Sequence, residues 1–270
     1  MNAQQGPHWS HFDSPAPAVL ESRKPHFEVA GQDEALARMH YLVDQGRRLG
    51  LLTGPSGCGK SFLFQRFSIE SQRLGREVVA LDLLGADGRD LLWQLASRLL
   101  ARVNIQDPRF LLWRAISDRL LEHRLQGLAT ILLVDHVDQA TDEALSVLIR
   151  VLHLDEHPDR RLTVLLAADK SHVGKLDPRL LERVDLQIEV EPWSEEEVGE
   201  FLRHRLSALR EPALKADSRT AARVWQLSQG IPRRVVRLVE LLLVAGASDR
   251  SSLLGPHTVD AVHRELVPAA

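Results

Sequence analysis

Short apolar runs alternate with longer helical patterns over the first two thirds of the chain. The apolar runs lie at 49–53, 77–83, 130–135, 162–168 and 184–190. Their near-continuous apolar character is typical of parallel strands that are buried on both faces of a sheet. Helical periodicity fills the segments before and between them, at 31–46, 60–74, 89–103, 108–126, 139–153 and 177–183. This alternation predicts an α/β fold with a doubly wound parallel sheet.

The pattern changes after residue 192. The segment "SEEEVGEFLRHRLSAL" opens with a serine followed by acidic residues, which is typical of a helix start. Further helical patterns follow at about 218–228, 232–246 and 257–267, with no strand-like run among them. We therefore expect an extended arm at 1–27, an α/β domain at 28–192 and a small all-helical domain at 193–270.

The composition is that of an ordinary soluble globular protein, with 44% hydrophobic and 26% charged residues among 270. A net charge of −3 disfavours a nucleic-acid-binding surface that covers a whole domain. The candidates for local DNA contact are the basic segments 47–50, 71–76 and 203–210. The N-terminus lacks a signal-peptide pattern, and the apolar run at 241–247 is too short to span a bilayer. We expect a cytoplasmic protein that does not insert into a membrane.

The segment "GPSGCGKS" at 54–61 joins an apolar run to a helical pattern and matches the Walker A motif. Backbone N–H groups of such a loop bind phosphate oxygens, and the following helix adds its positive N-terminal dipole. Lys60 can reach the β- and γ-phosphates, and the Ser61 hydroxyl can ligate Mg²⁺. The alternative is a glycine-rich turn that matches by chance. We predict that ATP is bound by Gly54, Pro55, Ser56, Gly57, Cys58, Gly59, Lys60, Ser61 and Phe62.

The run "TILLVD" ends in Asp135, at the edge where open α/β sheets bind ligands. A carboxylate there can hold the magnesium, so Ser61 and Asp135 are the predicted metal ligands. Many P-loop ATPases carry a water-activating glutamate at the next position, where this chain has His136. A neutral imidazole can accept a proton, and Asp138 and the acids at 142–144 are the other candidate bases. His136 could equally be a simple loop histidine.

The chain from about residue 8 to 247 resembles the AAA+ ATPases. Within that family it is similar to the ExeA/GspA-type secretion ATPases, and the TnsC/TniB transposition regulators lie nearby. The residues that carry the resemblance are "EALARMHYLVDQGRRLGLLTGPSGCGKS", "LLVDHVDQ", "EVEPWSEEEVGEFLRHRL" and "GIPRRVVRLVE". The resemblance implies a P-loop NTPase core with a parallel sheet, followed by a small all-helical lid domain.

The resemblance also implies roles for single residues. It makes Arg233 of "GIPRR" the sensor-2 arginine, which reaches the phosphates from the lid, and places Asp169 at the sensor-1 position. It makes Arg183 the inter-subunit arginine finger, with Arg179 as the second choice. A finger acts on the γ-phosphate of a neighbouring subunit and so implies a homo-oligomeric ring or filament. Val29 falls where the family contacts adenine.

Three functions remain open from the sequence. The first is an ATP-dependent motor or switch that remodels or positions a protein partner, as in a secretion assembly. The second is an ATPase that assembles on duplex DNA. The third is a nucleotide-sensing module that binds ATP or ADP and hydrolyses little ATP. The histidine at 136 favours slow hydrolysis, because the expected glutamate is missing. The sequence does not identify the partner.

Overall fold

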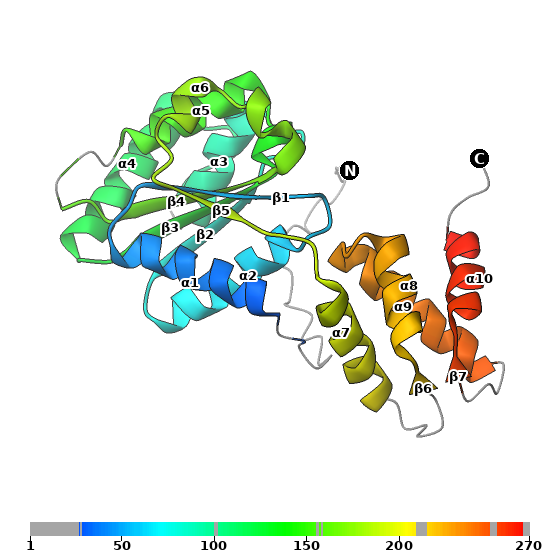
Figure 1. The fold of residues 1–270 in the computed structure, drawn as a ribbon. Coiled ribbons are helices and arrows are strands. Elements are labelled where there is room, and N and C mark those ends of the chain that lie inside the picture. The colour runs from blue at the N-terminus through cyan, green and yellow to red at the C-terminus, as the bar shows by residue number, and fades with distance from the viewer. Residues whose placement is uncertain are drawn as a thin grey trace, which may run out of the picture.

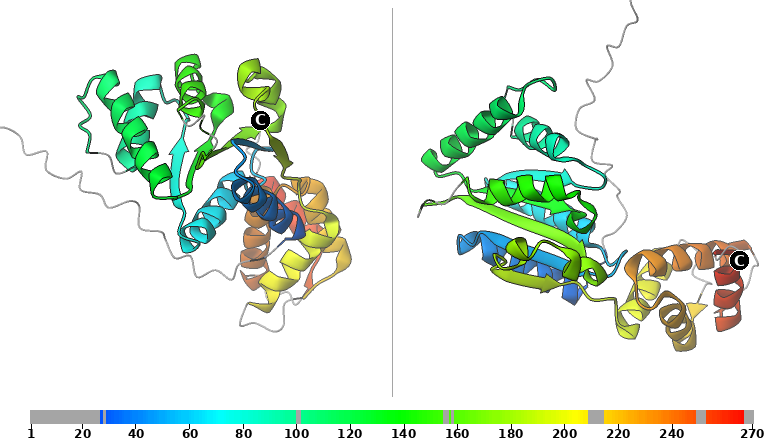
Figure 2. Two further views of the ribbon diagram at one scale, coloured as in Figure 1. Left: turned by 90° about the vertical axis from the view of Figure 1, so that its left-hand side faces the viewer. Right: turned by 90° about the horizontal axis from the view of Figure 1, so that it is seen from above.

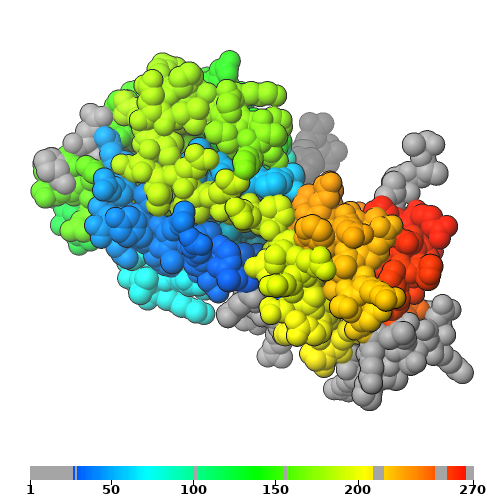
Figure 3. Space-filling view, viewed as in Figure 1, coloured from blue at the N-terminus to red at the C-terminus, as the bar shows by residue number. Residues whose placement is uncertain are grey.

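The computed structural model describes residues 27, 29–99, 102–154, 157, 159–208, 215–248 and 253–266. They form an α/β domain and a helical domain that lie side by side (Figure 1). The space-filling view shows the two domains packed against each other (Figure 3). The arm predicted at 1–27 lies outside the described residues except for Phe27.

Five parallel strands form the sheet, in the lateral order β2-β3-β4-β1-β5. Their bounds are β1 (Leu49–Gly54), β2 (Glu77–Asp82), β3 (Thr130–Asp135), β4 (Leu162–Asp169) and β5 (Leu186–Glu189). The interior strand β1 is buried at all six positions, whereas the edge strand β2 alternates between buried and exposed residues toward its end. The predicted α/β fold with a parallel sheet is confirmed, because every predicted apolar run overlaps one of these strands.

Helices cover both faces of the sheet (Figures 1 and 2). One face packs against α1 (Ala30–Asp44) and α2 (Lys60–Arg73). The other face packs against α3 (Gly88–Arg98), α4 (Arg109–Leu125) and α5 (Asp142–Leu152). The remaining short elements are the 3₁₀ turns η1 (Val137–Gln139) and η2 (Lys170–Lys175) and the helix α6 (Pro178–Leu181).

The helix predicted at 139–153 begins later than expected. Its N-cap is Thr141, whose side chain accepts a hydrogen bond from the backbone N–H of Ala144. The three residues of η1 form a separate turn before it, so the acidic strand end and the helix are not continuous. Capping chemistry therefore decides this boundary, as is usual for Thr at such a position.

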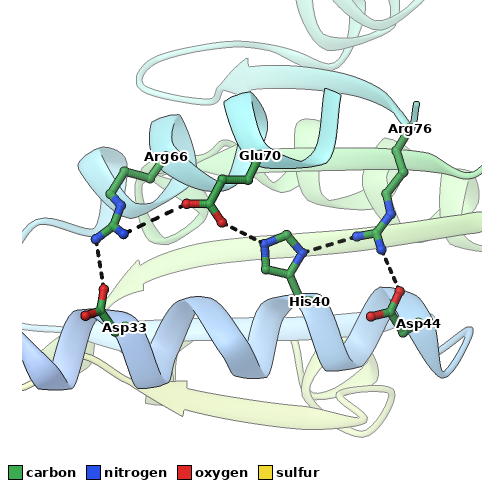
Figure 4. A network of polar contacts seen from close by, with 6 residues as sticks. All are labelled: Asp33, His40, Asp44, Arg66, Glu70 and Arg76. Carbon is green, nitrogen blue, oxygen red and sulfur yellow. Dashed lines mark hydrogen bonds and ion pairs between the residues drawn. The ribbon is translucent and has the colours of Figure 1, made fainter. Parts of the chain in front are cut away.

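A network of charged side chains joins α1 to α2 (Figure 4). His40 lies at its centre, with Nε2 3.0 Å from Glu70 and Nδ1 3.3 Å from Arg76. Arg76 also donates to Asp44 at 2.5 Å, and Arg66 donates to Asp33 at 3.1 Å. Because a guanidinium only donates, Nδ1 of His40 accepts and Nε2–H donates to Glu70. The network fixes the helix that begins at Lys60 against its neighbour.

The helical domain contains α7 (Glu195–Ser207), α8 (Ser218–Ser228), α9 (Pro232–Ser248) and α10 (Pro256–Leu266). The predicted capping serine is present: Ser194 accepts from the Glu197 N–H, and the Glu197 carboxylate accepts from the Ser194 N–H at 2.7 Å. The expectation of no strand in this part needs one correction. The two-residue strands β6 (Lys215–Ala216) and β7 (Leu253–Leu254) pair in parallel. Two residues are too few for a periodic pattern to predict.

The chain enters the helical domain at Trp193, whose backbone lies in close contact with Gly230. This residue has a φ of 67°, and a Cβ there would lie 2.1 Å from the carbonyl oxygen of Trp193. The Trp193 N–H donates to the Gly230 carbonyl at 2.8 Å, and the Trp225 indole donates to the Trp193 carbonyl at 3.0 Å. Only glycine combines this conformation with such proximity.

Candidate nucleotide-binding site

A cavity of about 580 Å³ lies between the carboxyl edge of the sheet and the helical domain. Its volume is within the range of small-molecule sites. The loop between β1 and α2, the ends of β3 and β4, and helix α9 all contribute to its wall. The predicted residues that line it are Ser56, Gly57, Gly59, Lys60, Ser61, Phe62, Asp135, His136, Asp138, Asp169 and Arg233.

The loop between β1 and α2 has the backbone of a phosphate-binding loop. Gly57 and Gly59 have φ values of 87° and 97°, a left-handed conformation that glycine adopts without steric cost. A Cβ on Gly54 would lie 2.5 Å from the Val190 carbonyl oxygen, so this position requires glycine because of close approach. The glycines of the motif are therefore explained by local geometry.

Lys60 lies at the first position of α2 and lines the cavity. Its ammonium donates to the carbonyl oxygens of Gly54 at 2.7 Å and Pro55 at 3.1 Å. These bonds hold a positive charge against the loop where phosphates are predicted to bind. Cys58, which we predicted as a nucleotide contact, differs: its side chain is fully buried in the core and lies outside the cavity wall. Burial raises the pKa of its thiol.

The two predicted metal ligands touch. Ser61 Oγ lies 2.5 Å from Asp135 Oδ2, although the two residues are far apart in the sequence. Hydroxyl and carboxylate oxygens are ligands that Mg²⁺ accepts, and one or two protein groups suffice when phosphates and waters complete the octahedron. No group of three or more His, Cys, Asp or Glu side chains suited to a metal occurs among the described residues. The site therefore fits a magnesium ion bound with a nucleotide.

His136 follows Asp135 in a left-handed conformation, with a φ of 54° and a ψ of 37°. Its backbone N–H donates to Asp135 Oδ1 at 2.9 Å, and its ring Nδ1 lies 2.9 Å from Asp82 Oδ1. Asp82 ends β2 and pairs in register with Asp135 at the end of β3. We did not predict Asp82 as a site residue. Its position near the end of the apolar run at 77–83 was the available signal.

Asp138, the second candidate base, is less accessible. Its carboxylate is 2% exposed and lies 3.1 Å from Nδ1 of His172, on η2. Asp169 accepts from the N–H and the hydroxyl of Ser171, and these bonds, with a smaller contribution from Lys60, lower the pKa of its carboxyl. The acids at 142–144 are outside the cavity wall. Sequence reasoning missed His172 as a site residue.

Helix α9 closes the cavity from the helical domain. The Arg233 backbone N–H donates to the Gly57 carbonyl at 3.1 Å, so the first turn of α9 contacts the phosphate loop directly. Arg233, Arg237 and Glu240 line the cavity from one face of the helix. We predicted only Arg233. The other two recur at i+4 and i+7 in "RRVVRLVE", which is the spacing of one helical face.

Residues 43–176, which contain the phosphate loop and Asp135, match the family described as AAA domain. This part of the chain is similar to AAA domains, and its fold is that of an AAA+ P-loop NTPase core. No curated protein matches the sequence. The match extends from the end of α1 to the residues before α6. The helical domain, which supplies α9, lies beyond the matched residues.

Three solved structures show the same fold at low identity. Cdc6p from Pyrobaculum aerophilum is 16% identical with a TM-score of 0.70, over 94% of this chain and 71% of that one. The Aeropyrum pernix ORC2 protein, in ADPNP–ADP complexes, is 16% identical with a TM-score of 0.65, over 94% and 70%. The Thermotoga maritima RuvB Holliday junction branch migration motor is 16% identical with a TM-score of 0.60, over 89% and 70%. Such similarity establishes the fold alone.

An aromatic cluster forms one wall of the cavity beside the AAA domain. Phe27, Trp193 and Phe201 all line it, with ring centroids 5.2–5.7 Å apart. Val29, where we expected an adenine contact, is 4% exposed, packs into the core of the helical domain and lies outside the cavity wall. Phe27 lines the cavity in its place.

The two candidate finger residues lie away from the cavity and beyond the residues that match the family model. Arg183 is exposed and lies just before β5. Two residues later, the backbone N–H of Asp185 donates to the carbonyl of Leu49, the first residue of β1. This is the amino edge of the sheet, opposite to the phosphate loop. Arg179 donates to Asp177 at 2.6 Å from its Nη2. Neither arginine lines the nucleotide cavity, so neither is placed to act on a nucleotide in the same subunit.

The described helices include none that is both long and apolar enough to cross a membrane.

Proposed function

We propose that the protein binds ATP with Mg²⁺ in this cavity, hydrolyses it slowly and uses the cycle to control its assembly with copies of itself and a partner. The observation that carries the proposal is the shared wall of the cavity. The phosphate loop of one domain and α9 of the other meet through the bond from Arg233 N–H to the Gly57 carbonyl. A triphosphate at this point contacts both domains and can change their relative arrangement.

The side chains at the site have complementary roles in this reaction. Lys60 and the loop N–H groups bind phosphate oxygens, and Ser61 and Asp135 hold the magnesium. When bound, Mg²⁺ offsets the negative charge of the phosphates. Water attacks the γ-phosphorus, and the bond between the γ-phosphorus and the β,γ-bridging oxygen breaks. His136 accepts a proton of the water. The products are ADP and inorganic phosphate, and the imidazole then releases the proton to solvent.

Assembly is proposed because the arginines that line the cavity in the described part of the chain, Arg233 and Arg237, both lie on α9. Arg183 lies on the opposite edge of the sheet and is exposed, so a second copy could bring it to the γ-phosphate of its neighbour. A secretion-ATPase-like role, in which the cycle remodels a protein partner, is part of the same proposal and rests on the resemblance of the sequence motifs.

The experiment is mass photometry with and without a slowly hydrolysed ATP analogue, combined with steady-state turnover of phosphate release. We expect larger assemblies with the analogue than with ADP, and slow turnover that rises with protein concentration. The Lys60→Ala variant is the control for nucleotide binding. Nucleotide binding without any change in mass or turnover would favour the nucleotide-sensing module instead.

A DNA-associated ATPase is the second candidate. A protein of similar fold, RuvB from Thermotoga maritima, is a Holliday junction branch migration motor. The basic segments offer less support, because Arg76 pairs with Asp44 and Arg205 with Glu240. Binding of duplex DNA that weakens steeply with salt would favour this candidate, because contacts to phosphates release counterions.

A further inference from the structure

We propose that Asp82 is a positioning residue that fixes the tautomer of His136, so that Nε2 faces the cavity as the proton acceptor. This inference deepens the proposed function and rests on it. Asp82 is the last residue of β2, and His136 follows the last residue of the neighbouring strand β3. Its carboxylate Oδ1 lies 2.9 Å from Nδ1 of His136.

The partner decides which nitrogen carries the hydrogen. An ionised carboxylate only accepts hydrogen bonds, so Nδ1 of His136 must donate to Asp82. The second carboxylate near the ring, Asp135, lies 3.9 Å away and also on the Nδ1 side. A neutral imidazole has a single N–H, so Nε2 keeps its lone pair. Nε2 makes no hydrogen bond to a described residue, and His136 lines the cavity.

The backbone holds the ring in this position. His136 has a left-handed conformation, which is uncommon outside glycine and is maintained only where the surroundings hold it. Its N–H donates to Asp135, and its carbonyl accepts from the Gln139 N–H at 2.9 Å. Asp82 is itself held, because its Oδ1 also accepts from the Leu84 N–H at 3.0 Å. The carboxylate and the ring are therefore both fixed before a nucleotide binds.

The direct test is the ¹⁵N chemical shift of the His136 ring in the protein without nucleotide. We expect Nδ1 protonated and Nε2 unprotonated in the wild type. In Asp82→Ala the ring should move toward the Nε2–H form, because the acceptor is gone. An Nε2–H ring in the wild type would overturn the proposal, whatever the turnover.

Turnover tests the consequence. Asp82→Ala should lower kcat about ten- to hundredfold with little change in the KM for ATP, the same range as for the loss of a partner that orients a metal-bound histidine. Asp82→Asn keeps an oxygen acceptor and should retain more turnover than Asp82→Ala. The matched control is Asp118→Ala, which removes a similarly exposed carboxylate on α4 and should have no effect.

The same substitution in the His136→Glu background separates positioning from a structural role. A carboxylate has no tautomer to fix, so Asp82→Ala should not lower turnover there. Equal losses in both backgrounds would show that Asp82 acts only on structure and would overturn the inference. A damaging His136→Ala with a silent Asp82→Ala would overturn the positioning alone. A silent His136→Ala would overturn the proposed base and, with it, the catalytic consequence of the pair.

Discussion

The hydroxyl of Ser61 lies 2.5 Å from the carboxylate of Asp135, so the phosphate loop and the end of β3 meet at one point. Ser61 lies in the first turn of α2, the helix that follows β1, whereas Asp135 ends β3, and β4 separates β1 from β3 in the sheet. The contact brings together the two groups that suit a magnesium ion. It also places His136, the next residue, beside the predicted γ-phosphate position.

Lys60→Ala should abolish ATP binding or lower turnover on the order of 10²–10³-fold. The loop then loses its positive point charge, which is held over the carbonyls of Gly54 and Pro55. Isothermal titration with ATP and a phosphate-release assay measure the two effects. Wild-type binding and turnover in this variant would refute the assignment of the phosphate loop.

Arg183→Ala should leave ATP binding nearly unchanged and lower assembly-dependent turnover by about 10³-fold, because a finger stabilises charge mainly in the transition state. Mixing this variant with Lys60→Ala should restore part of the activity, since each Lys60→Ala subunit still supplies an intact Arg183. Arg179→Ala is the matched comparison from the same segment. A mixture no more active than the sum of its components would rule out action between subunits.

His136→Ala should remove most of the turnover while Asp138→Asn has a smaller effect, because the Asp138 carboxylate is buried against His172. His136→Glu should keep or raise turnover, because a carboxylate can also accept the proton of the water. The reverse order, with Asp138→Asn damaging and His136→Ala silent, would assign the base to Asp138. Equal trace rates in all variants would indicate a nucleotide-binding switch.

The stability of the α/β domain should decrease between about pH 7 and pH 5 partly through His123, which is 1% exposed. Its Nδ1 lies 2.8 Å from Thr130 Oγ1, and its Nε2 is buried without a described partner. Burial, and next the charge of Arg119, lower the pKa of His123. On acidification the unfolded chain therefore takes up a proton before the folded one, which favours unfolding. Urea unfolding at several pH values should show a shallower dependence for His123→Gln, and an unchanged dependence would contradict this assignment.

Gly230→Ala should destabilise the helical domain on the order of 1–3 kcal/mol, because alanine is strained at a φ of 67°. The added Cβ would also collide with the Trp193 carbonyl oxygen, which lies 2.1 Å from its ideal position. Thermal unfolding followed by Trp fluorescence measures the loss. Gly31→Ala is the control, since a Cβ there meets no atom within 4 Å, and it should be close to neutral.

Much of the fold could be predicted because its signals are local. The apolar runs gave all five strands of the large sheet, and Ser194 with Glu197 predicted the start of α7. The motif residues at Lys60, Ser61 and Asp135 were likewise predicted and line one cavity. The side chains of Cys58 and Val29 lie in hydrophobic cores and outside the cavity wall. Which way a side chain points depends on the elements packed against it, and the motif does not contain that information.

The sequence by itself determined the elements, the phosphate loop and the edge of the sheet at which the site lies, because periodicity, glycine conformation and capping act over a few residues. Only the tertiary structure decided the lateral strand order, which places Asp82 beside Asp135 and makes it the partner of His136. The same holds for His172 against Asp138 and for Phe27 at the cavity wall. These contacts join distant segments, and they form because packing of the whole chain brings those segments together. No local preference encodes them.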